Sequence, residues 1–334
     1  MVMSETIYTP PQDIRSVAVI GTGSVGCGWA ALFLARGMRV FAYDSSPQAE
    51  SRVREFVSNA WAGLFSLGIA GVRSAPLDLL QFVSTPTEAV QLADLVQENV
   101  PEQPDLKRTV LTELDAAATP NKVILSSTGG MSPTALQASC VHPERLVVVH
   151  PFHPSHLIPL VEVIGGKHTT PEVIDWALEF SRLIGKRPIR LNAEASGHLT
   201  NRLQFALVRE AVACLLEGIA SAGDIDAAVR YGLGPRWSLM GSLLTLHLAG
   251  GAGGMRGILD HAGGSIQEWW TPMAVPQLTP EVKARLVAAS EELSEGLGVD
   301  QWAAWRDTNL VDVLKLQMAR EHPDREPDQG VTYE

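Results

Sequence analysis

Three histidines stand at intervals of three residues in His150-Pro-Phe-His153-Pro-Ser-His156, directly after an apolar run at 146–149. Three imidazoles in one segment suggest a metal-dependent hydrolase. However, the two prolines prevent a regular helix that would bring the rings to one face, and no nearby carboxylates or cysteines complete a metal site. Alternatively, a histidine at the carboxyl end of a strand can act as general base on a hydroxyl, with a carboxylate holding its tautomer. We favour acid–base chemistry, expect no metal, and expect His142 and His156 to be structural or exposed.

A glycine-rich turn provides a second candidate site. Gly21-Thr-Gly23-Ser-Val-Gly26 lies between a strand expected at 16–20 and a helix expected at 24–36. Glycines permit the tight turn and let backbone amides approach a pyrophosphate at the N-terminus of the helix, whose dipole favours an anion. The turn therefore predicts dinucleotide binding, with the cofactor against Gly21, Gly23, Ser24, Val25 and Gly26.

Asp44 follows the next strand, expected at 39–43, where a carboxylate can hydrogen-bond the hydroxyls of the adenosine ribose. A 2′-phosphate on that ribose would meet the negative charge of Asp44. The next residues are Ser45 and Ser46, whereas NADP binding favours a nearby arginine. The sequence therefore predicts NAD as the cofactor.

Short apolar strands alternate with helical patterns through the first part of the chain. Such alternation implies βαβ units with right-handed crossovers and a largely parallel sheet. Beyond about 193 the strand signals stop, and the sequence predicts a helix over 196–218, capped by Ser196, and another that opens at Ser221. Further strands are expected at 80–84, 94–97, 122–125, 145–149 and 160–164, and further helices at 238–248, 255–261, 280–297 and 301–320.

This pattern predicts an α/β fold: a Rossmann-type doubly wound, mostly parallel sheet with a C-terminal all-helical domain. The expected boundaries are 1–193 for the NAD-binding domain, 194–320 for the helical domain and 321–334 for a polar tail. We expect NAD and a small-molecule substrate to bind between the two domains.

Composition limits the classes of partner. The chain has 334 residues, 46% hydrophobic and 19% charged, which is typical of a folded globular protein. Its net charge of -11 repels phosphate backbones, so nucleic acid is not expected. Residues 17–35 carry no charge, but their glycines indicate a buried strand and a turn rather than a membrane span. Three separated cysteines and no recognisable signal peptide predict a reducing, cytoplasmic location.

Several short motifs follow one another in a fixed order. Over about 15–320 the pattern resembles the 3-hydroxyacyl-CoA dehydrogenase superfamily. The branch that it resembles contains L-gulonate 3-dehydrogenase (lambda-crystallin), carnitine 3-dehydrogenase and ketoreductases of aromatic polyketide pathways. Besides the glycine-rich turn, the motifs are Val96-Gln-Glu98-Asn-Val-Pro-Glu102, Asp105-Leu-Lys107-Arg108, Leu125-Ser-Ser-Thr128, His150-Pro-Phe152, Leu160-Val-Glu162-Val163, Asn201-Arg-Leu203, Gly232-Leu-Gly-Pro-Arg-Trp237, His247-Leu-Ala-Gly-Gly251 and Gly253-Gly-Met-Arg256.

The resemblance implies NAD-dependent interconversion of an L-3-hydroxy acid, or a 3-hydroxyacyl group, and its 3-keto form. It makes His150 the catalytic base and Glu162 its orienting partner. It places Asn201 beside the substrate oxygen, and Glu98 and Lys107 beside the cofactor. It also implies a homodimer formed through the helical domain.

Two positions depart from the family pattern. Gly129 stands where a serine commonly follows the Ser/Asn-Thr pair, and His153 stands where an asparagine is expected. Both positions normally contact the carbonyl or hydroxyl of the substrate. Either the substrate differs, or Ser127, Thr128 and His153 take over these contacts.

The distribution of charge bears on the substrate. Between Asp44 and Lys107 the basic residues are Arg52, Arg54 and Arg73 alone. Because the phosphates of a CoA thioester need several cations, this segment favours a smaller 3-hydroxy acid or a ketone without such a carrier.

Other residues suggest how a small substrate is held. Arg236 is a candidate to clamp a substrate carboxylate. Trp237, with Trp269 and Trp270, either forms an aromatic cage for a quaternary ammonium or packs in the helical core or a subunit interface. Two alternatives stay open: a 3-hydroxyacyl-CoA dehydrogenase or polyketide ketoreductase, and a non-catalytic NAD-loaded structural protein.

Overall fold

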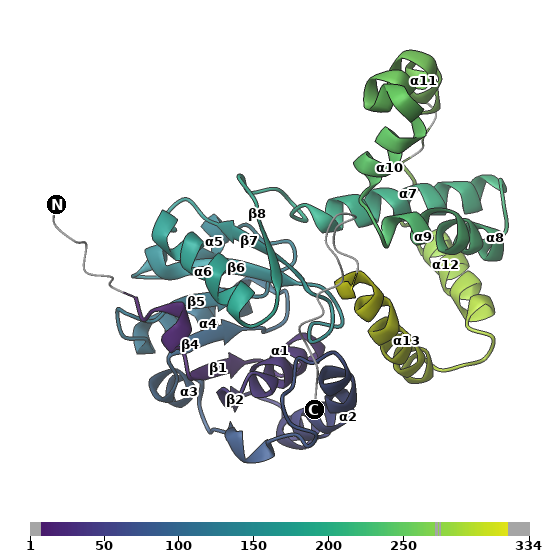
Figure 1. Cartoon of the computed structure of the whole chain (residues 1–334). Helices are drawn as coiled ribbons and strands as arrows, with labels where there is room; N and C mark the ends of the chain where they lie inside the picture. Colours follow the sequence, from purple (N-terminus) through teal and green to yellow (C-terminus); the bar gives the residue numbers. More distant parts are fainter. Residues whose placement is uncertain (1–7, 271–272, 274, 320–334) are drawn as a thin grey trace. The chain divides into compact units, whose positions relative to one another are not determined.

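The computed structural model describes residues 8–270, 273 and 275–319 (Figure 1). The chain divides into two compact units, the first ending at Arg202 and the second beginning at Leu203. The first unit is a sheet with helices on both faces. The described part of the second unit is helical. The predicted α/β class with a C-terminal all-helical domain is confirmed.

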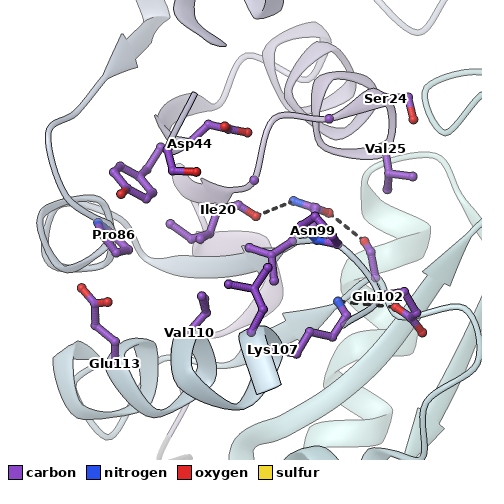
Figure 2. Close-up of a pocket in the computed structure, with 18 residues that line it drawn as sticks. Ile20, Ser24, Val25, Asp44, Pro86, Asn99, Glu102, Lys107, Val110 and Glu113 are labelled. Carbon is purple, nitrogen blue, oxygen red and sulfur yellow. Dashed lines mark hydrogen bonds and ion pairs between the residues drawn. The ribbon is translucent and has the colours of Figure 1, made fainter. Parts of the chain in front are cut away.

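One eight-stranded sheet, ordered β3-β2-β1-β4-β5-β6-β7-β8, forms the centre of the first unit. Neighbouring strands are parallel except β6 and β7. In doubly wound sheets ligands bind at the carboxyl ends of strands where the strand order reverses, here between β1 and β4. Ile20, Asp44 and Asn99 lie around one pocket at that edge (Figure 2). The strands are β1 Ser16–Ile20, β2 Arg39–Tyr43, β3 Leu80–Phe82, β4 Leu95–Glu98, β5 Ile124–Ser126, β6 Leu146–Pro151, β7 Leu160–Gly165 and β8 Arg187–Arg190.

The helices of the first unit begin at recognisable signals. Four of them have proline in the first turn, where no hydrogen-bond partner is needed for its nitrogen. In three of these four, the side chains of Thr85, Ser132 and Thr170 accept a hydrogen bond from a backbone amide of the first turn. The helices are α1 Ser24–Ala35, α2 Ala49–Ser66, α3 Pro86–Leu92, α4 Pro104–Ala117, α5 Pro133–Gln137 and α6 Pro171–Leu183.

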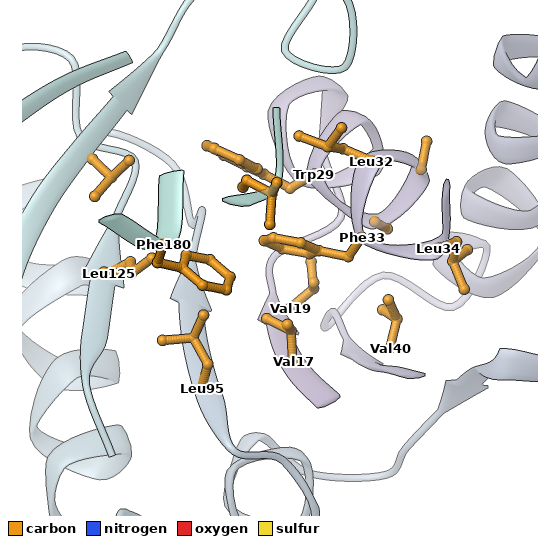
Figure 3. Close-up of a cluster of buried hydrophobic side chains, with 14 of the residues drawn as sticks. Val17, Val19, Trp29, Leu32, Phe33, Leu34, Val40, Leu95, Leu125 and Phe180 are labelled. Carbon is orange, nitrogen blue, oxygen red and sulfur yellow. The ribbon is translucent and has the colours of Figure 1, made fainter. Parts of the chain in front are cut away.

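Both faces of the sheet are buried, because successive side chains of a strand point to opposite faces. Val17 and Val19 of β1 belong to a cluster that includes residues of α1, α2 and α6. In this cluster the rings of Trp29 and Phe33 stack with 5.4 Å between centroids (Figure 3). Ala18 and Ile20 belong to a second cluster with residues of α3, α4 and α5. Burial on both faces explains why β1 is apolar at nearly every position.

The second unit contains most of α7 and the helices that follow. Ser221 caps α8 as predicted, since its hydroxyl accepts a hydrogen bond from the amide of Asp224 at 3.1 Å. In the described residues no helix is long and apolar enough to cross a membrane. The predicted tail 321–334 lies outside the described residues. The helices are α7 Thr200–Glu217, α8 Ala222–Ala227, α9 Gly234–Trp237, α10 Ser242–Ala249, α11 Gly254–Trp270, α12 Pro280–Leu293 and α13 Val299–Ala319.

Two features differ from the sequence analysis. Strand β8 was not predicted, because Arg187-Pro-Ile-Arg190 lacks an apolar run; it lies at the sheet edge, where proline is tolerated. The prediction that Ser196 caps a helix is wrong, since α7 begins at Thr200. Gly197 and His198, with φ of 74° and 52°, have left-handed conformations that a right-handed helix cannot contain.

Candidate active site

The glycine-rich turn joins β1 to α1 with almost no free space around two of its glycines. Gly21 has a φ of 85°, and a Cβ there would lie 2.8 Å from the carbonyl oxygen of Asn99. A Cβ on Gly26 would collide with the carbonyl oxygen of Gly21. Around Gly23, by contrast, a Cβ would meet nothing within 4 Å. The turn is thus closed toward β4 and open where a ligand can approach the backbone.

Asp44 ends β2 beside this turn. Its Oδ2 accepts hydrogen bonds from the amide and hydroxyl of Thr22 at 2.7 and 3.1 Å, and its Oδ1 accepts from the amide of Ser46 at 2.9 Å. Burial alone would raise the pKa of Asp44, but these hydrogen bonds and Arg52, at 3.8 Å, lower it below its ordinary value. Asp44 is therefore a carboxylate at neutral pH. The proximity of Arg52, from α2, was not predicted.

A cavity of about 590 Å³ connects these features within the first unit (Figure 2). Gly21, Gly23, Ser24 and Val25 line it at the N-terminus of α1, and Asp44 lines it at the end of β2. Gly26 is not among its lining residues. Helix N-terminal amides suit a diphosphate and a carboxylate suits ribose hydroxyls, so the residues present fit a dinucleotide.

Glu98 and Lys107 form a buried ion pair at the edge of this cavity. The ammonium Nζ of Lys107 is 2.8 Å from Oε1 of Glu98, and the two side chains are 1% and 0% exposed. The amide of Val100 and the hydroxyl of Ser126 also donate to Glu98. Lys107 lines the cavity and its Nζ lies 3.7 Å from Oε2 of Glu102, whereas Glu98 is not among the lining residues. The pair thus joins β4 to α4 beside the expected cofactor.

The hydroxyls of Ser127 and Thr128 both have hydrogen-bond partners among the side chains of the first unit. Ser127 Oγ accepts from Trp29 Nε1 at 2.9 Å, donates to the side-chain oxygen of Asn99 at 2.8 Å, and lines the cavity. The hydroxyl of Thr128 bonds to the carboxylate of Glu102. Ser127 therefore belongs to the lining of this cavity, whereas the hydroxyl of Thr128 points toward Glu102.

His150 and Glu162 are paired residues on the antiparallel strands β6 and β7. Nδ1 of His150 lies 2.8 Å from Oε2 of Glu162, which is fully buried. Oε1 of Glu162 accepts from the amides of Leu199 and Thr200 at 3.1 and 2.7 Å. Although burial alone would raise the pKa of Glu162, hydrogen bonds from His150 and Thr200 lower it. Glu162 is thus a carboxylate able to hold one tautomer of His150.

The other imidazole nitrogen of His150, Nε2, faces the loop after β5. A Cβ built on Gly129 would lie 3.0 Å from Nε2 and 3.6 Å from Nδ2 of Asn201. The side-chain amide of Asn201 donates to the carbonyl of Gly129 at 2.9 Å. The structure therefore brings together His150, Glu162 and Asn201, three residues predicted to act in one site.

His198 is a residue near this site that the sequence analysis missed. Its ring centroid is 5.4 Å from that of His150, and its Nε2 lies 3.2 Å from the carbonyl oxygen of Thr128. Burial, and the neighbouring His150, lower the pKa of His198, so the ring is neutral at neutral pH. The only signal in the sequence is its place after Gly197, directly before α7.

The remaining predicted site residues are His153, Arg236 and Trp237. His153 is exposed, whereas His156 is buried with its ring edge-on to Phe56. Within the described ranges no three histidine, cysteine or acidic side chains form a group suited to a metal. Arg236 and Trp237 lie on α9 in the second unit, both exposed, and their contact with substrate stays a prediction.

Comparison with known proteins identifies the family. Residues 16–194 match the model of the 3-hydroxyacyl-CoA dehydrogenase NAD binding domain, and residues 197–285 match that of its C-terminal domain. The L-carnitine dehydrogenase of Streptomyces griseus is 46% identical over 305 residues, covering 91% of this chain and 90% of the relative. That of Bacillus cereus is 43% identical over 304 residues, covering 91% and 93%.

A solved structure supports the assignment over nearly the whole chain. The NAD+-dependent dismutase 5-formyl-3-hydroxy-2-methylpyridine 4-carboxylic acid 5-dehydrogenase has a TM-score of 0.77 and 31% identity, and the match covers 92% of this chain and 99% of that one. The predicted resemblance and the NAD cofactor are confirmed. The protein is an NAD-dependent oxidoreductase that acts on CH–OH groups, and the chain belongs to the 3-hydroxyacyl-CoA dehydrogenase family.

Proposed function

We propose that this protein interconverts an L-3-hydroxy acid and its 3-keto form, with His150 as general base and acid. The observation that carries the proposal is the arrangement around His150. Glu162 binds Nδ1, which leaves Nε2 directed toward Gly129 and Asn201. A base must have one nitrogen free for the reacting proton and the other held in position.

In this mechanism each side chain has a separate task. His150 Nε2 accepts the proton of the substrate hydroxyl, and the adjacent carboxylate of Glu162 stabilises the imidazolium that forms. Asn201 keeps one N–H on the carbonyl of Gly129 and directs its other amide atoms to the substrate oxygen. NAD, when bound against the glycine-rich turn with Asp44 on its ribose, supplies the hydride acceptor. In the reverse direction, protonated His150 returns the proton.

The substrate class that we propose is a free 3-hydroxy acid rather than a CoA thioester. The three arginines of the segment before Lys107 already have partners. Arg52 lies 3.8 Å from Asp44, Arg54 is 2.9 Å from Glu50, and Arg73 stacks on Phe65 at 5.4 Å. Cations already engaged in this way attract the phosphates of CoA less strongly. The names of the curated relatives suggest L-carnitine as the first compound to test.

The second unit is proposed to bind substrate through Arg236 and Trp237 and to form a homodimer. Many of its apolar side chains are exposed, among them Val299 at 85%, Leu243 at 74% and Tyr231 at 69%. Exposed apolar surface of this kind marks protein–protein contacts. Light scattering at micromolar concentration should give twice the mass of the chain.

We also propose that the NAD-binding domain ends at residue 193 and that the protein is located in the cytoplasm.

A substrate screen tests the proposed reaction. NADH formation is followed with L-carnitine, L-gulonate, L-3-hydroxybutyrate and 3-hydroxybutyryl-CoA at equal concentrations. We expect turnover with at least one free acid. Failure with all four, together with failure of the corresponding 3-keto compounds to oxidise NADH, would contradict the proposal.

A further inference from the structure

The cofactor cavity extends to both sides of Asp44. Ser24 and Val25, at the N-terminus of α1, line it on one side, and Pro86 and Glu113 line it on the other (Figure 2). A dinucleotide carries diphosphate, ribose and adenine in that order. With the diphosphate at α1 and the ribose at Asp44, the adenine base comes next, on the side of Pro86 and Glu113.

Apolar and aromatic side chains form much of the lining on this side. Tyr43 ends β2, Pro86 begins α3, and Leu106 and Val110 belong to α4. Ligand sites combine walls of this kind with a few polar groups that fix the orientation of the ligand. The walls suit the faces of a purine ring, and a polar partner is needed for its edge.

Glu113, on α4, provides an oriented acceptor beside these walls. Its Oε1 accepts a hydrogen bond from the hydroxyl of Thr87, on α3, at 3.0 Å. Its other oxygen, Oε2, has no hydrogen-bond partner in the part of the chain that the structure describes. One carboxylate oxygen is therefore held by a neighbouring helix, and the second is available to a donor in the cavity.

We propose that Glu113 selects adenine as the base of the dinucleotide by accepting a hydrogen bond from its exocyclic amino group. An ionised carboxylate accepts hydrogen bonds and donates none. Adenine presents an amino donor on this edge, whereas guanine and hypoxanthine present a carbonyl oxygen at the same position. Two facing acceptors repel each other, so Glu113 is a specificity-determining residue for the cofactor. The inference rests on NAD binding and is independent of the substrate.

The test compares NAD with nicotinamide hypoxanthine dinucleotide, in which a carbonyl oxygen replaces the amino group of the base. Calorimetry at neutral pH gives the Kd of each dinucleotide without substrate, so the result does not depend on turnover. The variants are Glu113→Gln and Glu113→Ala. Glu88→Gln is the matched control, because Glu88 lies on α3 and accepts from the amide of Ser84 at 3.0 Å but does not line the cavity.

The wild type should bind NAD about fivefold more tightly than the hypoxanthine dinucleotide, which is the effect of about one hydrogen bond at an exposed side chain. Glu113→Gln should bring the two Kd values within about twofold, because an amide can donate to the carbonyl oxygen as well as accept from the amine. Glu113→Ala should do the same, since it removes the acceptor. Glu88→Gln should keep the wild-type ratio.

Three results would overturn the inference: equal or tighter binding of the hypoxanthine dinucleotide by the wild type, an unchanged ratio of Kd values in the Glu113 variants, or the same fall of the ratio in Glu88→Gln. A loss of affinity that is equal for both dinucleotides counts as an unchanged ratio, because removing one negative charge affects both diphosphates alike. All of these results leave the proposed reaction standing, since the substrate screen tests it separately.

Discussion

His150 and Glu162 face each other across the antiparallel strands β6 and β7, with 2.8 Å between Nδ1 and Oε2. The second oxygen of Glu162 binds the amides of Leu199 and Thr200. One buried carboxylate therefore orients the imidazole and also positions the beginning of α7, which carries Asn201. The pairing register of two strands and the start of a helix together determine the geometry of the proposed site.

Glu162→Gln should slow turnover without weakening NAD binding. Glutamine retains a hydrogen-bond acceptor for the amides of Leu199 and Thr200, but it no longer stabilises a charged imidazolium. A fall in kcat of about 10- to 100-fold with an unchanged Kd of NAD is expected. Steady-state kinetics and NAD titration measure both quantities. A variant that kept the wild-type kcat would show that the carboxylate charge has no part in the reaction.

Glu162→Gln should also change how the free energy of unfolding depends on pH. The pKa of Glu162 is lowered in the folded protein, so its stabilising contribution is complete above the ordinary carboxyl pKa of about 4.3 and is lost as pH falls toward the lower folded value. The difference in unfolding free energy between the wild type and Glu162→Gln should therefore shrink as the pH falls below about 5. Denaturant melts at several pH values below about 5 test this; a difference that grew over that interval would contradict it.

Asp44→Arg should weaken NAD and admit NADP. The ribose loses its carboxylate partner, and the new cation joins Arg52, which lies 3.8 Å from Asp44 in the wild type, to attract a 2′-phosphate. Asp44→Asn is the control, because it removes the charge and keeps an oxygen for the amide of Thr22. The kcat/KM ratio of NADP to NAD should rise in Asp44→Arg and much less in Asp44→Asn. Equal kcat/KM for NAD and NADP in the wild type would refute the role of Asp44.

Lys186 should make the protein more stable as pH rises above neutrality. Burial lowers its pKa to about 7, although its Nζ donates to the carbonyls of Ser155 and Ile158. Between about pH 7 and pH 9 the unfolded state binds more protons than the native state, so stability rises with pH. The unfolding free energy of the wild type, relative to Lys186→Met, should increase over that interval. A constant difference would mean that Lys186 stays protonated in the fold.

Free acids should outperform CoA thioesters as substrates. Arg52, Arg54 and Arg73, the arginines between Asp44 and Lys107, are engaged with Asp44, Glu50 and the ring of Phe65, which leaves few cations in this segment for the phosphates of CoA. The kcat/KM values of L-carnitine and 3-hydroxybutyryl-CoA, measured side by side, test this. A preference of tenfold or more for the thioester, equal to about 1.4 kcal/mol, would contradict the argument from charge.

Much of the first unit could be predicted because its signals are local. A short stretch of sequence is enough to predict the apolar strand β1, the turn formed by the glycines that follow it, and the place of Asp44 after β2. The sequence predicted that His150 and Glu162 lie on adjacent strands, but it did not predict that the two residues are directly paired. Their antiparallel register depends on the path of the intervening residues, which no spacing rule determines.

Other features depend on contacts between segments far apart in the sequence. Strand β8 exists because β7 offers an edge to pair with, not because Arg187-Pro-Ile-Arg190 favours a strand. Ser196 has the right residue type for a helix cap, but the left-handed turn at Gly197 and His198 delays the helix to Thr200. The hydroxyl of Thr128 bonds to Glu102, a partner set by the loop after β4. Tertiary contacts override local preference at each of these positions.

The most direct test of the account is the turnover of His150→Asn, with His142→Asn as the matched control. His142 is a half-exposed histidine 3.4 Å from Glu144 and has no part in the proposed site. With the best substrate of the screen, His150→Asn should lose about 10²- to 10⁴-fold in kcat, with the Kd of NAD unchanged, while His142→Asn keeps the wild-type rate. Wild-type kcat in His150→Asn, with loss of activity in His153→Asn or His156→Asn instead, would contradict the assignment of His150 as the base.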